Sequence, residues 1–393
     1  VLLTERMVQP MDKPTVQDIF HRFYPAYLDQ YSPSPVQAKV AHNIMNCKTG
    51  AYGANVCVCE DCGFVQIHYN SCRNRCCPMC QAVPKEMWMD ARREDVLDAP
   101  YFHLVFTVPD ILNPVIYSNQ RLLYDALYHA ASSTISELTA DPKHLGAKVG
   151  YICILHTWGS EMNFHPHIHT ILLGGGLASN NQWKDNGENF FLPIRVISKM
   201  FRGKYLEELK RLWEEDKLVF HGTAEKFRNH YTFKELLDSC YGMDWIPHCK
   251  KTFNGAQTVI KYLGKYTHRI AVSNHRIVCM DDDTVTFLVK DYRNEGQWKE
   301  LTISGVEFVR RFLMHVPPRR FVRIRHYGLL CSRTKSQKLT LCRNLLGCKK
   351  YLSKLRDMEM PEILEHLYGI KVCVCKACGG HLGKPQMKMP LRC

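Results

Sequence analysis

This 393-residue chain lacks several features that define large classes of proteins. It has no run of eighteen or more apolar residues, so the sequence offers no transmembrane helix. The opening residues VLLTERMVQP do not resemble a secretory signal, which predicts a cytoplasmic protein. The triple glycine at 174–176 matches no phosphate-binding loop, so a nucleotide cofactor is not expected. No low-complexity segment or solenoid period is present.

Acidic residues are the scarcer charged class. The chain has 38 Asp and Glu against 52 Lys and Arg, a net charge of +14, and its sequence pI is near 9.0. A basic balance favours a polyanionic partner, because Lys and Arg neutralise phosphates and release counterions. Apolar residues make up 46% of the chain, which is enough for two or three domains with cores of their own.

Cysteine is abundant, and its placement is clustered. The chain has 19 cysteines, and eight of them fall between Cys47 and Cys80. Clustered Cys-x-x-Cys pairs without a secretory signal are typical of metal sites rather than of disulfides. Two pairs separated by fourteen residues predict a zinc ribbon with four thiolate ligands: Cys59, Cys62, Cys77 and Cys80. A closed shell of this kind is structural, because it leaves no open coordination position.

The remaining cysteines leave two further zinc sites open. One further site could be completed by four cysteines and a nearby histidine: Cys47, Cys57, Cys72, Cys76 and His42. The alternative is that several of these cysteines are buried free thiols. Near the end of the chain, Cys375 and Cys378 form a possible second zinc knuckle. Its remaining ligands would come from Cys373, His381 or Cys393. The sequence VCVCEDCG at 56–63 is echoed by VCVCKACG at 372–379.

The segment HPHIH at 165–169 predicts a second type of metal site. Alternate residues of a strand share one face, so His167 and His169 can bind one ion. His156 lies on the preceding strand and comes opposite His167 in a hairpin that turns near residues 161–162. We therefore expect His156 to be the third ligand, with His165 and Gln257 as alternatives. Imidazole ligands alone favour zinc or another late transition metal.

Two tyrosines four residues apart, Tyr262 and Tyr266, lie in a predicted helix at about 255–269. Positions i and i+4 share one helix face, so both phenols can face one substrate. A metal beside tyrosine can break a phosphodiester and hold the broken end covalently. The alternative is an ordinary aromatic core face. Basic neighbours favour phosphate binding instead: Lys261, Lys265, His268 and Arg269. Gly264 predicts a close approach of DNA or of backbone at this helix.

A basic segment with interleaved aromatic residues follows at 310–327. Four arginines there could hold single-stranded DNA through its phosphates while aromatic rings stack on bases: Arg319, Arg320, Arg323 and Arg325. The alternative is a solvated basic face without a ligand.

Strand and helix patterns predict an α+β protein. Strands are expected at 101–108, 148–158 and 167–177, and helices at 111–139 and 198–215. We expect six segments: an N-terminal helical segment (1–41), a zinc-ribbon-like module (42–84), a linker helix (85–99), a catalytic domain with the tyrosine helix (100–275), a strand-rich basic region that contacts DNA (276–340) and a C-terminal tail (341–393).

Several ordered motifs resemble one family, the HUH rolling-circle transposases of the insertion sequence 91 type, which carry two tyrosines. The motifs run through most of the chain: YNSCRNRCCPMCQ at 69–81, PYFHLVFTVP at 100–109, LHTWGSEMNFHPHIHTILLGGGL at 155–177, YLGKYTHRIAVSN at 262–274, VKDYR at 289–293 and RIRHYGLL at 323–330.

The resemblance implies a palm-like nuclease core with an antiparallel sheet, ferredoxin-like and flanked by helices. It implies Mg²⁺ or Mn²⁺ at His167 and His169, structural Zn²⁺ in the cysteine module, and Tyr262 and Tyr266 as nucleophiles. The implied activity is cleavage and joining of single-stranded DNA at transposon ends through a 5′-phosphotyrosine link, in a bacterial, nucleoid-associated protein. Two residues depart from the family pattern: Cys76 stands where histidine is usual, and Ser160 replaces a glutamine.

Three other functions compete with transposition. A plasmid replication initiator or a relaxase would use the same chemistry. A zinc-dependent DNA-binding regulator with an inactive nuclease core would need none of it, and the intact His and Tyr motifs argue against that. A hydrolytic metalloenzyme acting on a small substrate would leave the tyrosine pair and the basic charge unexplained.

Overall fold

The computed structural model describes residues 13–186, 192–245, 247–253, 259, 264, 271–291 and 294–388. Several predicted site residues lie outside the described residues: Gln257, Lys261, Tyr262, Lys265, Tyr266, His268, Arg269 and Cys393. Among the described residues, no helix is both long and apolar enough to cross a membrane.

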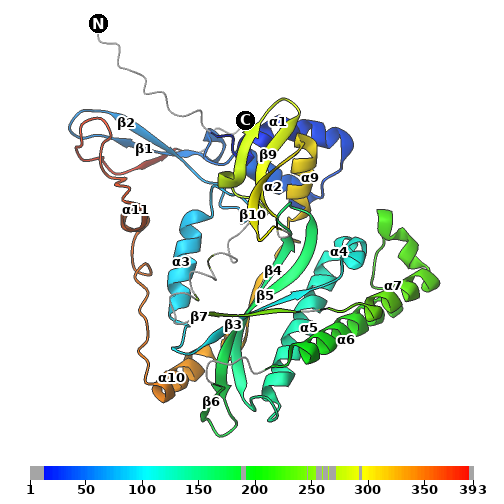
Figure 1. Cartoon of the computed structure of the whole chain (residues 1–393). Helices are drawn as coiled ribbons and strands as arrows, with labels where there is room; N and C mark the ends of the chain where they lie inside the picture. Colours follow the sequence, from blue (N-terminus) through cyan, green and yellow to red (C-terminus); the bar gives the residue numbers. More distant parts are fainter. Residues whose placement is uncertain are drawn as a thin grey trace.

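A central antiparallel sheet organises the molecule (Figure 1). Its strand order is β11-β4-β5-β3-β7, and the short β6 pairs with β5. The strands are β3 (Tyr101–Thr107), β4 (Lys148–Trp158), β5 (Phe164–Leu177), β6 (Trp183–Asp185), β7 (His248–Phe253) and β11 (Ile324–Gly328). The main helices that connect them are α5 (Gln120–Ala140), α6 (Ile194–Glu214) and α7 (His230–Gly242). The order β3-α5-β4-β5-α6-β7 with this pairing is a ferredoxin-like split βαβ arrangement, which confirms the predicted α+β core.

The two faces of the sheet differ because side chains alternate along each strand. Phe102, Leu104 and Phe106 of β3 face the largest core, which α5 and α6 cover. The opposite face packs against α3 (Ala82–Arg93) and α10 (Lys335–Leu346), where Ile154 and Ile171 are buried. This second face also carries the histidines of HPHIH. Short helical segments complete this part: α4 (Asn113–Ser118) and 3-10 turns at Asp110–Leu112 and Gly222–Arg228.

A second core joins segments from distant parts of the sequence. It is built from α1 (Val16–Gln30), α2 (Pro35–Met45), β8 (Ile277–Met280), β9 (Thr284–Asp291), β10 (Gln297–Ser304) and α9 (Gly305–Met314). Capping boxes at Thr15 and Ser34 start the two N-terminal helices by satisfying their first free backbone amides. Trp158 and Met162, at the tip of the β4–β5 hairpin, insert into this core. Residues of the predicted segments 1–41 and 276–340, from Val16 to Ala41 and from Ile277 to Val316, thus share one core.

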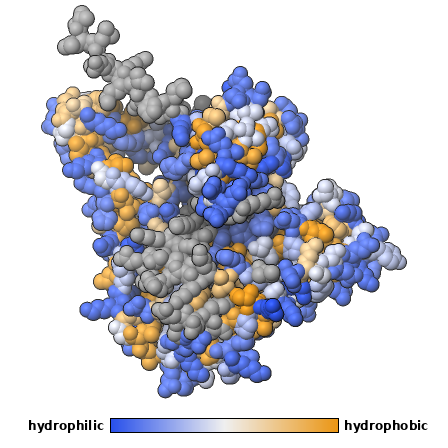
Figure 2. Space-filling view, in the orientation of Figure 1, coloured by the Kyte–Doolittle hydropathy of each residue, from blue (hydrophilic) through white to orange (hydrophobic). Residues whose placement is uncertain are grey.

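The cysteine module is a small sheet in which both ends of the chain meet. β1 (Ala54–Val58) pairs with β2 (Val65–Tyr69) on one edge and with β12 (Gln386–Lys388) on the other. Figure 1 shows the C-terminal segment with α11 (Met360–Tyr368) beside the β1–β2 hairpin. The hairpin exposes several large side chains with apolar surface: Val58, Phe64, Val65, Ile67 and Tyr69. Figure 2 shows orange residues among blue ones over this part of the molecule, at the upper left.

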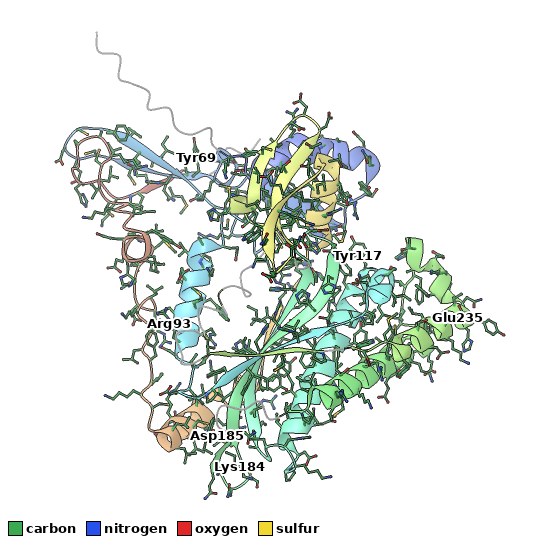
Figure 3. The ribbon with its side chains drawn as sticks, viewed as in Figure 1. Tyr69, Arg93, Tyr117, Lys184, Asp185 and Glu235 are labelled. Atoms are coloured by element: carbon green, nitrogen blue, oxygen red, sulfur yellow. The ribbon has the colours of Figure 1, made fainter. Side chains whose placement is uncertain are left out.

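The chain between α10 and α11 runs along α3 and is held there by one buried carboxylate. Asp90 of α3 accepts hydrogen bonds from the Tyr351 hydroxyl at 2.7 Å, the Ser353 hydroxyl at 2.5 Å and the Leu355 amide at 3.0 Å. Arg93, labelled in Figure 3, lies over the Tyr351 ring at 5.7 Å from its centroid. The C-terminal segment is therefore fixed against the body of the protein before it reaches the cysteine module.

Candidate metal centres and DNA-binding residues

Three histidines converge on the face of the sheet opposite α5 and α6. In the β4–β5 register, His156 lies directly opposite His167, and Ile154 lies opposite His169. The ring nitrogens of His156, His167 and His169 all lie within 4.8 Å of one another, and Nε2 of His167 is 3.0 Å from Nε2 of His169. The structure therefore brings together the three predicted ligands. His165, the alternative, is not part of this group.

Outer hydrogen bonds orient two of these rings. Nδ1 of His167 donates to the carbonyl oxygen of His165 at 2.7 Å, which leaves Nε2 as the nitrogen with a free lone pair. Nδ1 of His169 lies 2.9 Å from Nε2 of His103. His103 was missed in the sequence because YFHLVFTV reads as an apolar strand. The available signal was its position on β3, two residues before Val105, which pairs with His169.

Burial favours the neutral form of His167 and of its neighbour His103. Desolvation lowers the pKa of His167 to about 4, although a hydrogen bond with the His165 backbone opposes the shift. Desolvation, with repulsion from His248 and His167, lowers the pKa of His103 to about 3. Neutral imidazole is the form that binds a metal ion, so the lowered pKa of His167 leaves this ring able to bind one at neutral pH.

The segment that contains the two tyrosines contacts the same face at two described positions. Val259 is helical and buried, and it belongs to the core cluster that contains Met89, Ile154 and Ile171. A Cβ atom at Gly264 would meet the Met89 sulfur of α3 at 2.0 Å. A side chain therefore approaches this glycine, where DNA or backbone was expected. Tyr262 and Tyr266 flank Gly264 in sequence and lie outside the described residues.

One cysteine cluster lies at the base of the β1–β2 hairpin. The sulfurs of Cys47, Cys72, Cys77 and Cys80 lie within 4.8 Å of one another. Cys80 is 3.3 Å from Cys47 and 3.5 Å from Cys72. Hydrogen bonds from Cys72 and Cys77 hold the pKa of Cys80 well below its usual range, so a thiolate is favoured there. Cys77 is fully buried in the core shared by α1, α2 and α9.

A second cluster lies at the opposite end of the same hairpin. It contains Cys59 and Cys62 from the β1–β2 turn, together with Cys375 and Cys378 from the C-terminal segment. The predicted grouping of Cys59 and Cys62 with Cys77 and Cys80 is therefore wrong. Five residues of β2 separate the two pairs, and a strand of that length spans roughly 17 Å. Among the described residues, the C-terminal knuckle is completed by Cys59 and Cys62 rather than by Cys373 or His381, and Cys393 lies outside those residues.

Other predicted zinc ligands have different surroundings. Cys76 is buried beside Arg75 and Arg323 and belongs to neither described cluster. His42 lies 3.2 Å from the Asn46 side-chain amide, also outside both clusters. Cys57 packs in the small apolar core under the second cluster. The prediction that Cys76 and His42 complete a zinc site is therefore not supported by their positions.

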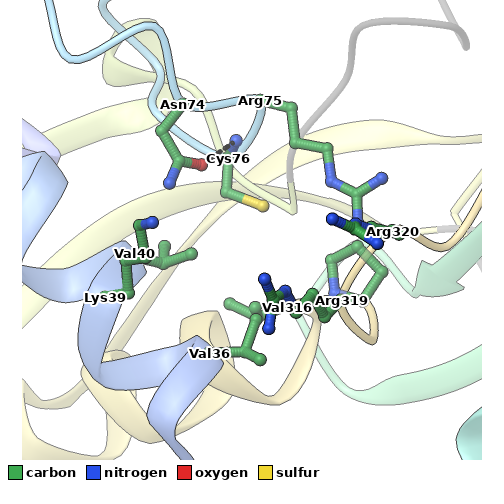
Figure 4. A pocket seen from close by; sticks show the side chains of 10 residues that line it. Val36, Lys39, Val40, Asn74, Arg75, Cys76, Val316, Arg319 and Arg320 are labelled. Carbon is green, nitrogen blue, oxygen red and sulfur yellow. Dashed lines mark hydrogen bonds between the residues drawn. The ribbon is translucent and has the colours of Figure 1, made fainter.

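The four predicted DNA-binding arginines separate into two pairs. Arg325 forms an ion pair with Asp125 and lies over the Tyr128 ring at 3.9 Å, while Arg323 is half-buried near Cys76. Arg319 and Arg320 are exposed. They line a cavity of about 340 Å³ with Lys39 and Arg75, and Figure 4 shows these basic groups around the Cys76 thiol. Of these four arginines, the exposed pair is therefore the better placed to contact phosphate.

Comparison with known proteins gives matches along most of the chain. Residues 150–338 match the family described as "Putative transposase", and residues 19–108 match the "Transposase zinc-binding domain". The "Putative transposase y4qJ" of Sinorhizobium fredii (strain NBRC 101917 / NGR234) is 40% identical, over 93% of each chain. The transposase for insertion sequence element IS801 of Pseudomonas savastanoi pv. phaseolicola is 30% identical, over 77% of this chain and 72% of its own length.

Among solved structures, a copper-bound conjugative relaxase TrwC in complex with oriT DNA matches with a TM-score of 0.26. It is 13% identical, over 65% of this chain and 98% of that one. The two transposases match over far more of their lengths at higher identity. On that evidence the chain belongs to the insertion sequence 91 type of transposases and has the N-terminal zinc-binding domain of that family.

Proposed function

We propose that this transposase cleaves and rejoins single-stranded DNA at transposon ends, through a 5′-phosphotyrosine link to Tyr262 or Tyr266. The observation that carries the proposal is the group of three histidines on one sheet face, whose ring nitrogens all lie within 4.8 Å of one another. Two residues of the tyrosine segment, Val259 and Gly264, are buried against the same core. The candidate metal ligands and these two residues therefore lie on the same side of the sheet, which supports the assignment of the neighbouring tyrosines as nucleophiles.

The donor atoms fit a bound divalent cation. His156, His167 and His169 would hold it through unprotonated ring nitrogens, with His165 and His103 fixing the orientation of two rings. A bound ion would neutralise the scissile phosphate and stabilise charge in the transition state. The family resemblance implies Mg²⁺ or Mn²⁺, whereas a set of three imidazoles is also suited to softer metals. A metal series in the assay distinguishes these ions.

Cleavage and rejoining of the DNA need no cofactor that supplies energy. The phenolic oxygen of one tyrosine bonds to phosphorus, and its proton leaves. The bond from phosphorus to the 3′ oxygen breaks, and that oxygen takes up a proton to become a 3′-OH. Attack of a 3′-OH on the phosphotyrosine reverses the step and joins strands, so no nucleotide triphosphate is needed.

Basic residues near the nucleophiles would hold the DNA. We propose that Lys261, Lys265 and Arg269 contact phosphates next to the cleaved bond. Arg319 and Arg320 would contact the strand further away, through the basic pocket shown in Figure 4. Arg323 and Arg325 have internal contacts and are proposed to support this loop.

The test uses single-stranded DNA from a transposon end, labelled on the 3′ side of the cleavage site. Protein and DNA are incubated with Mg²⁺, Mn²⁺ or Zn²⁺ and separated on a denaturing gel. We expect a metal-dependent labelled protein adduct. His167→Ala and His169→Ala should each remove it, and at least one of Tyr262→Phe and Tyr266→Phe should abolish it.

Matched controls test whether these effects are local. Tyr231→Phe and His221→Ala change an exposed tyrosine and an exposed histidine away from the histidine group, and both should keep the adduct. Cleavage without an adduct would mean that water, and not tyrosine, is the nucleophile. Tight DNA binding without cleavage, in every metal, would favour the regulator with an inactive core.

A further inference from the structure

The second cysteine cluster is made of two loops with the same local design. The sequences are CEDCG at 59–63 and CKACG at 375–379. In each loop the glycine amide donates to the carbonyl of the first cysteine, from Gly63 to Cys59 at 3.0 Å and from Gly379 to Cys375 at 2.9 Å. Both glycines have positive φ, +72° and +79°, which side chains rarely adopt. The sequence echo is therefore a repeated metal-knuckle turn.

Backbone amides in the C-terminal knuckle point at its sulfurs. The Ala377 amide donates to Sγ of Cys375 at 3.4 Å, and the Gly380 amide donates to Sγ of Cys378 at 3.4 Å. Amide donors of this kind favour the thiolate over the thiol. In a metal site, amides in these positions would hydrogen-bond the ligand sulfurs and hold them in place around the ion.

The spacing between the sulfurs fits a shared ion. Cys59 and Cys378 are 3.5 Å apart, and Cys62 and Cys375 are 3.8 Å apart. A tetrahedral zinc with Zn–S bonds of about 2.3 Å places its sulfurs roughly 3.8 Å apart. A disulfide would need about 2.05 Å. Each pair joins one cysteine from the hairpin with one from the C-terminal segment, so a single ion would hold both.

The backbone around the sulfurs joins the same two segments. Glu60 donates to the carbonyl of His381 at 3.1 Å, and Gly383 donates to the carbonyl of Val58 at 2.9 Å. Beyond this contact, β12 pairs with β1 in register from Ala54 to Val56. Cys57 and Leu382 are buried beneath the sulfurs. The two knuckles therefore dock through hydrogen bonds and a small apolar core.

We propose that Cys59, Cys62, Cys375 and Cys378 bind one zinc ion that fastens the C-terminal segment to the N-terminal zinc-binding domain. The family's zinc-binding domain covers residues 19–108, so half of this site lies beyond it. The matched core covers residues 150–338 and contains neither knuckle. The site is distinct from the cluster of Cys47, Cys72, Cys77 and Cys80, and it does not depend on the proposed DNA cleavage.

The test measures zinc per chain in the full-length protein by elemental analysis, after dialysis without chelator. The parent protein carries His167→Ala and His169→Ala, which remove the histidine site, and we expect it to hold two zinc ions, one at each cysteine cluster. Adding Cys378→Ser should reduce the value to one. Cys373→Ser changes a neighbouring exposed cysteine outside the cluster, so it should leave two.

A ligand-restoring variant and a cobalt spectrum test the zinc site even if Cys378→Ser folds poorly. Cys378→His restores a zinc ligand at an exposed position, so it should return the content to two ions. Cobalt exchanged into the protein should give the absorption of two tetrahedral thiolate sites, and Cys378→Ser should halve it. One zinc in the histidine-free parent, or unchanged zinc after Cys378→Ser, would overturn the proposal. Mass spectrometry that found a disulfide among the four cysteines would also overturn it.

Discussion

Each of the two cysteine clusters contains four cysteines, but the clusters differ in how far apart in the sequence those cysteines lie. Cys47 and Cys80 are 33 positions apart, whereas Cys59 and Cys378 are 319 positions apart. The first cluster is packed in a core with α1, α2 and α9, and Cys77 is fully buried. In the second, Cys62 and Cys378 are exposed. A local cluster is thus part of a hydrophobic core, while a long-range cluster joins two segments at the surface.

This difference predicts different consequences for stability. Metal bound inside a core contributes to the folding of everything packed on it. Metal bound at a surface junction stabilises mainly that junction, because the rest of the protein can stay folded when the junction opens. Four experiments test the contrast, in order of decreasing expected effect.

Cys77→Ser should have the largest effect. It removes a fully buried ligand from the local cluster, and we expect the free energy of unfolding to fall by more than about 4 kcal/mol. Urea unfolding followed by tryptophan fluorescence measures the change. Cys76→Ser is the matched control, since Cys76 is also buried but belongs to neither cluster. Equal losses in the two variants would contradict a metal contribution.

Acid should weaken the core that surrounds the local cluster. Burial lowers the pKa of His315 to about 4, and its ring lies between the Met162 carbonyl at 3.0 Å and the Thr157 hydroxyl at 3.1 Å. Unfolded histidine has a pKa near 6.5, so between these values the unfolded state binds more protons. The stability from neutral His315 is complete above about pH 6.5 and is lost as the pH falls toward 4.

The expected loss from His315 is about 2 kcal/mol at pH 5 relative to pH 7. The urea midpoint is measured at pH 5 and pH 7 for the wild type and for His315→Asn. The contribution of His315 is the difference between the two proteins in how far the midpoint falls. His315→Asn should show a smaller dependence on pH because the titrating group is gone. An identical dependence in both proteins would show that His315 is already protonated or exposed in the folded state.

Cys378→Ser should act locally. We expect global unfolding to change by less than about 1 kcal/mol, because the main cores do not include this cluster. Hydrogen exchange should rise in β12 and in residues 54–56 of β1, where the two strands pair. Exchange in α5 serves as the internal reference. Faster exchange in α5 as well would mean that the long-range cluster supports the whole fold.

Gly380→Ala should have the smallest effect. A Cβ atom there would meet the Asp61 carboxylate at 1.8 Å, but an exposed side chain can move away. We expect a loss of less than about 0.5 kcal/mol in the docking of the two knuckles. Gly379→Ala is the comparison, since positive φ makes it strained and costs about 1 kcal/mol. Hydrogen exchange in β12 should rise more in Gly379→Ala, and the reverse order would contradict the geometry.

Much of the fold and of the histidine group could be predicted from local patterns. Period-two alternation placed His167 and His169 on one face, and hairpin geometry placed His156 opposite them. His103 could not be distinguished from an apolar strand residue, because its role depends on the neighbouring strand. Arg325 resembled a phosphate ligand until the fold brought Asp125, 200 positions away, against it.

The pairing of the cysteine knuckles could not be derived from spacing. Each Cys-x-x-Cys can join any other, and the separation along the chain carries no information about which pair folds together. The strand β2 decides the outcome, since it carries the chain from one end of the hairpin to the other between Cys62 and Cys72. The repeated motif at 56–63 and 372–379 was the available signal for the correct partner.

Because β12 pairs with β1, folding of the cysteine module cannot be completed until the C-terminal segment has been synthesised. Chains emerge from the ribosome N-terminus first, and early segments begin to fold while later ones are still being made. Cys47 to Cys80 can gather early, but Cys59 and Cys62 must wait until Cys378 has been synthesised. During translation the hairpin holds an incomplete pair of thiols, and a chain that stops before the last knuckle never completes it. The four-cysteine site can therefore form only in a chain whose synthesis has reached the C-terminal segment.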